Sequence, residues 1–139
     1  MSQGVSAEPS DQVVRQRIRN RIVEYLELAS SFDAQRAYQA AVQVPVPSEV
    51  INQWEDWVPD PGDESFVQPV FSPAEQEAIA SFHRVWEEVA AAIPNPLPQL
   101  ENILVLLAWE RLRGAAATAL HVFMARGKLP EDHEFDRLH

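Results

Sequence analysis

The chain of 139 residues contains no cysteine. This absence excludes disulfide bonds, thiol catalysis and zinc sites built from thiolates. A domain of roughly 150 residues buries about two thirds of its unfolded surface, so the chain needs neither cross-links nor a metal to be stable. A reducing compartment suits such a chain, and we expect a cytoplasmic protein.

Glycine is also scarce. The four glycines are Gly4, Gly62, Gly114 and Gly127. Their spacing fits neither a dinucleotide-binding fingerprint nor a phosphate loop, and the chain has no Gly-x-Ser-x-Gly motif. We therefore predict no catalytic residue and no cofactor.

Few residues are candidates for a metal site. His83 and Glu87 stand four residues apart in a predicted helix, so both side chains can face one ion, and His121 in another helix can join them. A diiron bundle needs two Glu-x-x-His pairs, and the sequence has none. A place at the edge of an apolar stripe is the simpler explanation of His83, and we predict no metal site.

No apolar run is long enough to span a bilayer. The most apolar run, Ile103 to Trp109, ends at Glu110, far short of the ~20 residues that a transmembrane helix needs. The N-terminal residues lack a basic start followed by an apolar stretch, so we expect no secretory signal. With 21 acidic and 11 basic side chains the net charge is −10, which repels nucleic acids and anionic membranes. We expect no nucleic acid and no membrane, but a basic protein partner or a homodimer.

The pattern of apolar residues is helical throughout. They recur every three or four positions, and no segment shows sustained two-residue alternation. Ser72, Pro73 and Glu75 form the clearest helix start, a capping box with proline at its favoured position. Asp11 and Ser48 are further candidate N-caps. The predicted helices cover residues 11–29, 34–42, 48–57, 73–93 and 98–126.

These patterns predict an all-α fold, an irregular bundle of about five helices. We expect a long proline-containing loop over residues 59–72 and a largely buried C-terminal helix that either bends at Gly114 or is crossed closely there. Residues 12–129 form the predicted domain. Residues 1–11 are expected to be a disordered tail, and residues 130–139 a C-terminal tail.

Four arginines stand close together in the first predicted helix. They are Arg15, Arg17, Arg19 and Arg21. On a helical wheel centred on Ile18, two of them fall on each side of the apolar stripe. A nucleic-acid-binding helix more usually has its arginines on one outward face, so we interpret the four as a basic rim whose stems pack beside the core.

The middle third of the chain lacks the opposite charge. From Ala37 to His83 there is no lysine or arginine, but there are eight carboxylates. This segment either folds back on the basic first helix, within one molecule or across a dimer, or faces outward to bind a basic protein. The interface candidates are Glu49, Glu55, Asp56, Trp57, Asp60, Asp63 and Glu64.

The leading hypothesis is a non-enzymatic protein-binding module, such as a regulator, adaptor, inhibitor or chaperone, that uses the acidic segment 49–64. Trp54 belongs to an apolar stripe and should face the core, whereas Trp57, last in its helix, can be partly uncovered. The alternative is a small-molecule or metal-binding protein, or an enzyme, with a pocket near Gly114–Ala119 and His121. A third hypothesis is that the charge division serves only a homodimer.

Overall fold

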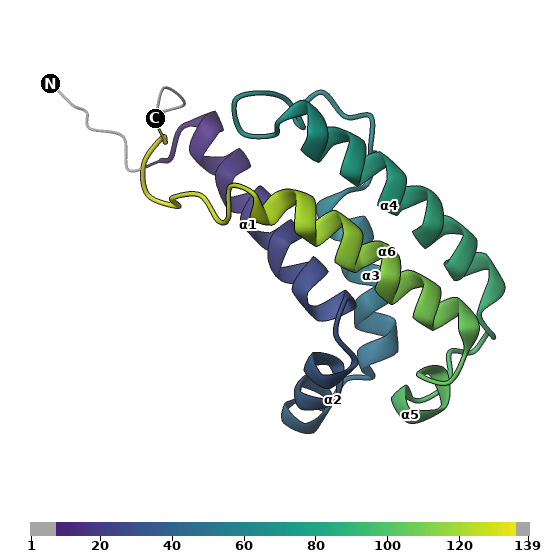
Figure 1. Cartoon of the computed structure of the whole chain (residues 1–139). Helices are drawn as coiled ribbons and strands as arrows, with labels where there is room; N and C mark the ends of the chain where they lie inside the picture. The colour runs from purple at the N-terminus through teal and green to yellow at the C-terminus, as the bar shows by residue number, and fades with distance from the viewer. Residues whose placement is uncertain (1–7, 136–139) are drawn as a thin grey trace, which may run out of the picture.

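The computed structural model describes residues 8–135, which form six helices (Figure 1). They are α1 (Asp11–Ala29), α2 (Phe32–Ala41), α3 (Val46–Trp57), α4 (Pro73–Ala92), α5 (Leu100–Ile103) and α6 (Leu107–Met124). The described part contains no strand, so the prediction of an all-α bundle is confirmed. Parts of the two expected tails, residues 1–7 and 136–139, lie outside the described residues.

Side-chain caps start three of the helices. The Ser72 hydroxyl accepts a hydrogen bond from the Glu75 N–H (3.2 Å), and the Glu75 carboxylate accepts one from the Ser72 N–H (3.1 Å), which confirms the capping box. Ser31 caps α2. The cap of α1 is Ser10, whose hydroxyl accepts from the Val13 N–H, while Asp11 is the first helical residue.

The start of α3 differs from the prediction. The helix begins at Val46 behind Pro45, and Ser48 lies inside its first turn instead of capping it. Proline suits this turn because its φ is already helical and its missing N–H would have no partner there. Pro47 therefore stands within α3.

The last predicted helix is divided in two. Residues 104–106 form a turn between α5 and α6, and the N-cap residue of α6, Leu106, offers no side-chain cap. In a continuous helix neighbouring side chains point about 100° apart. The turn instead lets two neighbours, Ile103 and Leu104, both enter the core, while Val105 and Leu107 stay in solvent.

Helix α6 packs against both α1 and α4, most extensively against α4, alongside which it runs (Figure 1). Only one of its faces is buried, formed by Trp109, Leu112, Ala116, Ala119 and Phe123. The small side chains at 116 and 119 let α4 approach. Gly114 is not the crossing point, since a Cβ there would meet no atom within 4 Å, and α6 continues through it without a break.

The connection from α3 to α4 is anchored on the core. Val58, Phe66, Val70 and Phe71 are all buried, and the Phe71 ring lies 5.2 Å from Phe66 and 6.4 Å from Phe123. The polar residues between these anchors remain outside. Within residues 8–135, none of the helices combines the length and the apolarity that crossing a membrane requires.

Candidate functional site

Arg19 does not belong to a basic rim. Its side chain is completely buried and is bound by the carboxylate of Glu75 at the start of α4. Arg19 Nε donates to Glu75 Oε1 (3.1 Å) and its Nη2 to Oε2 (2.9 Å), while Nη1 donates to the carbonyl of Gly127 (2.6 Å). The guanidinium also lies 5.1 Å from the centre of the Phe123 ring. The correction follows from geometry: position 19 of α1 faces the place where α4 begins and α6 ends.

A second arginine, which is itself exposed, binds the same carboxylate. Arg126 Nε donates to Glu75 Oε2 (3.0 Å), and its other nitrogens donate to the carbonyls of Pro69 and Val70. We call Arg19, Glu75 and Arg126 the Glu75 triad. Burial alone raises the pKa of Glu75, but the hydrogen bonds from Arg19 and Arg126 outweigh it, so the net pKa is lowered and the carboxylate stays charged.

The other three arginines of α1 lie toward the surface. Arg17 donates to the carbonyl of Glu131 (2.8 Å), and Arg21 forms an ion pair with the Glu131 carboxylate. Arg15 is half-buried and has no ion pair within the described residues. The carboxylates that pair with the arginines of α1 are therefore Glu75, Glu131 and Glu24 of α1 itself, and none of them belongs to the interface candidates of residues 49–64.

Six of the seven interface candidates are carboxylates that gather on α3 and the following loop. We call them the acidic face: Glu49, Glu55, Asp56, Asp60, Asp63 and Glu64. All are exposed except Glu49, which is half-buried. Across the part of the chain that the structure describes, none of the six forms an ion pair with a lysine, an arginine or a histidine.

The acidic face is held only by local bonds. Glu49 accepts from the Gln53 amide, Asp60 from the Gly62 N–H (2.9 Å) and Asp63 from the Ser65 N–H (2.7 Å). Hydrogen bonds from the side chain and the backbone of Ser65 lower the pKa of Asp63. These contacts hold three of the six carboxylates in place, but they supply no counter-charge.

The two tryptophans of α3 have different environments. Trp54 is completely buried, with its ring 4.6 Å from Phe82 and 5.5 Å from Tyr25, and its Nε1–H donates to His83 Nδ1 (3.0 Å). Trp57 is half-buried: one side packs on the core and the rest remains accessible beside the acidic face. Only Trp57 can therefore contact a partner.

His83 has a structural role. Its Nδ1 accepts the hydrogen bond from Trp54 Nε1–H, and its Nε2 lies 3.7 Å from the Glu87 carboxylate. His121 is exposed on α6. In residues 8–135 no three histidine or acidic side chains are arranged to hold a metal ion.

A groove of about 340 Å³ lies between α4 and α6, next to the Gly114–Ala119 segment. Its walls are largely apolar, with Phe82, Val85, Ala119 and Val122 prominent, and His121 is not among its lining residues. Three polar side chains reach it: the Ser81 hydroxyl donates to Glu77 (3.4 Å) and accepts from Arg84 (3.2 Å), and the Thr118 hydroxyl donates to the carbonyl of Gly114 (3.1 Å). This groove lies beside the small residues named in the alternative hypothesis, but His121 does not line it.

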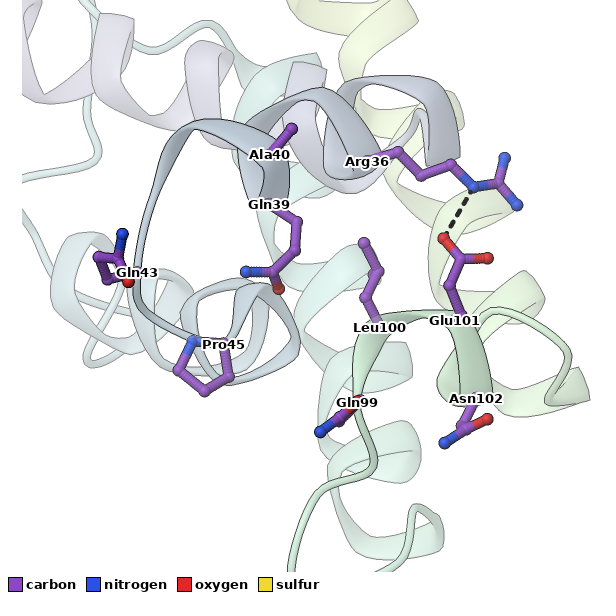
Figure 2. A pocket seen from close by; sticks show the side chains of 9 residues that line it. All are labelled: Arg36, Gln39, Ala40, Gln43, Pro45, Gln99, Leu100, Glu101 and Asn102. Atoms are coloured by element: carbon purple, nitrogen blue, oxygen red, sulfur yellow. Dashed lines mark hydrogen bonds and ion pairs between the residues drawn. The ribbon is translucent and has the colours of Figure 1, made fainter.

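A second hollow, of about 550 Å³, lies between α2 and α5 and was not predicted (Figure 2). Figure 2 shows Arg36 and Glu101 pointing toward each other at one end, where Arg36 Nε donates to Glu101 (3.2 Å). The Gln39 amide faces its centre but is already bonded to the backbone of Val44 and Val46. No sequence signal links residues 36–45 with 99–102, because neither segment has a motif.

Comparison with known protein families, with curated protein sequences and with solved structures found no match. Fold and surface chemistry are thus the only basis for a functional assignment. Of the features described, the acidic face combines exposure, a single sign of charge and an adjacent, accessible aromatic ring. Neither of the two hollows has convergent catalytic groups among its lining residues.

Proposed function

We propose that the protein is a non-enzymatic, cytoplasmic protein-binding module that uses the acidic face and Trp57 to bind a basic partner protein. It would act by occupancy, as a regulator, adaptor, inhibitor or chaperone does. The partner's lysines and arginines would meet the carboxylates, and an apolar side chain would cover the accessible part of the Trp57 ring.

The single observation that carries this proposal is the absence of counter-charge on the acidic face. Elsewhere in the described chain carboxylates are commonly paired, as Glu24 is with Arg21 and Lys128, and Glu110 with Arg113. Unpaired like charges repel one another in the compact protein, and a cationic surface would relieve this repulsion. Binding to a basic partner would therefore account for the unpaired carboxylates.

Trp57 supports the same conclusion through its position. Interface hot spots are enriched in tryptophan and lie near the centre of a contact, with charged residues around them. Glu55 and Asp56 immediately precede Trp57, and Asp60 follows it within three residues. An apolar anchor within a charged rim gives affinity through the ring and fast encounter through the charges.

The competing small-molecule hypothesis receives less support. Ligand sites combine apolar walls with a few converging polar groups. The α4–α6 groove has the walls, but its polar side chains bond to neighbours on their own helices, and His121 does not line it. A melting-temperature screen with apolar ligands would detect such a site independently of any protein partner.

The test is a comparison of variants that carry the same change in charge. Glu55→Lys with Asp56→Lys alters the acidic face, whereas Glu27→Lys with Asp33→Lys alters exposed carboxylates elsewhere. Each tagged protein is purified from native cells, and the captured proteins are identified by mass spectrometry.

We expect that basic proteins are captured by the wild type and by the 27/33 variant, but not by the 55/56 variant. With the captured partner, association of the 55/56 variant should be slower and less dependent on salt, because peripheral charges act mainly on encounter. Equal recovery with all three proteins would contradict the proposal.

A further inference from the structure

The last described residues form a strap across α1. We call residues 129–135 the C-terminal strap. They follow Gly127, whose positive φ of 73° turns the chain away from the end of α6, and they contain neither helix nor strand. Figure 1 shows this yellow segment returning along the first turns of α1. Residues 130–135 of the expected C-terminal tail therefore make hydrogen bonds to α1.

Two buried amides of α1 hold the main chain of the strap. Gln16 is completely buried, and its Nε2 donates to the carbonyls of Pro130 and His133 (both 2.8 Å), while its Oε1 accepts from the Phe135 N–H (3.2 Å). Asn20, one turn later, donates to the carbonyl of Leu129 (2.8 Å) and accepts from the N–H of the same residue (2.9 Å). A side-chain amide that both donates to and accepts from the main chain of one residue recognises the backbone itself.

Charges add side-chain selectivity. The Glu131 carboxylate receives a hydrogen bond from Asn20 (2.9 Å) and an ion pair from Arg21, and Arg17 donates to the Glu131 carbonyl (2.8 Å). At the far end the Ser10 hydroxyl donates to Glu134 (2.7 Å). Leu129 and Phe135 supply the strap's packing against the core. The face of α1 thus fits an acidic peptide with an apolar residue two positions before its glutamate.

We propose that this face of α1 is an acidic-peptide recognition site, and that it accepts the strap of a second copy of the chain in place of its own. The occupant is argued from the structure, since this strap is the peptide that the site is seen to fit. Exchange of an identical element retains every contact, and it requires a change only at the short connection around Gly127. The site is distinct from the acidic face and does not depend on its function.

A reciprocal charge swap tests the exchange in the full-length chain. The Glu131→Arg variant has two positive charges at this contact, because Arg21 of the same chain is unchanged. The Arg21→Glu variant has two negative charges there, because its Glu131 is unchanged. In a mixture each strap finds a matched α1 on the other variant. Both side chains are partly exposed, at 35% and 42%, so both variants should fold, which circular dichroism checks.

We expect each variant alone to be monomeric by light scattering and an equimolar mixture to form a heterodimer. The double variant Arg21→Glu with Glu131→Arg should be monomeric again, because its strap matches its own α1. A mixture that contains only monomers would overturn the exchange.

A synthetic peptide separates the site from the exchange. The probe is the octapeptide of residues 128–135, Lys-Leu-Pro-Glu-Asp-His-Glu-Phe, added to the full-length Glu131→Arg variant, whose own strap is weakened. We expect binding in fluorescence anisotropy, at least about tenfold weaker for the peptide with arginine in place of its first glutamate. Binding should be lost when Asn20→Leu is added to the protein. Binding of the peptide without heterodimer formation would overturn the second copy as occupant, and no binding would overturn the site.

Discussion

Two regions of this protein use carboxylates in opposite ways. Around α1 the acidic groups are paired: the buried Glu75 is held by Arg19 in the core and by the exposed Arg126, and Glu131 is held by Arg21 on the surface. On the acidic face the carboxylates have no cationic partner within residues 8–135. The paired groups fasten one segment of the chain to another. The unpaired groups make only local hydrogen bonds, so their removal should affect binding while leaving the fold intact.

Substitution in the Glu75 triad should have the largest effect on stability. Glu75→Gln removes the charge that compensates Arg19 and Arg126, and Arg19 remains fully buried. Breaking a buried pair in this way costs about 3–5 kcal/mol, because one charge is left without compensation. We expect a loss of this order in urea-induced unfolding. Glu77→Gln, on the exposed side of the same helix, is the control and should change stability by less than about 0.5 kcal/mol.

Acid should reveal the same group without a substitution. The folded-state pKa of Glu75 is lowered, so its contribution is complete above the unfolded value of about 4.3 and is lost as the pH falls through the folded pKa. Stability measured between pH 6 and pH 3, as rough limits, should therefore decline more steeply in wild type than in Glu75→Gln. Parallel curves for the two proteins would show that other carboxylates cause the acid sensitivity.

The hydrogen bond between Trp54 and His83 gives a smaller effect. His83→Leu leaves the buried Trp54 Nε1–H without an acceptor, which costs about 1–3 kcal/mol. His121→Leu is the matched control, since His121 is exposed and no hydrogen bond involving it joins it to the core. Thermal unfolding followed by tryptophan fluorescence measures both. Equal melting temperatures for the two variants would contradict the structural role of His83.

The comparison also explains what the sequence can predict. The Ser72–Glu75 capping box and the apolar stripe that buries Trp54 are local patterns, and both are confirmed. The turn at residues 104–106 was missed because it contains neither proline nor glycine and follows from packing. The lack of lysine and arginine between Ala37 and His83 can be read from the sequence alone, because it is a matter of composition.

The sequence mainly fails to predict contacts between residues that are distant along the chain. The pattern of apolar residues in α1 places Arg19 beside the apolar stripe, as it does the other three arginines. Its burial depends on Glu75, which lies 56 positions away. The strap is similar, because Gln16 and Asn20 bind backbone groups that every residue has. Such contacts leave no compositional trace. The acidic face remains a prediction about function, although its exposure can be read directly from the fold.

The smallest effect on stability should come from the acidic face itself. Glu55 and Asp56 lie in the last turn of α3, where negative charge interacts unfavourably with the helix dipole. Glu55→Lys with Asp56→Lys should therefore leave the free energy of unfolding unchanged or raise it by up to about 1 kcal/mol, although the same variant should bind a basic partner poorly. Urea-induced unfolding at low and high salt measures this, and any gain should shrink as salt screens the charges. A marked loss of stability would mean that these carboxylates support the fold, and the contrast between paired and unpaired regions would no longer hold.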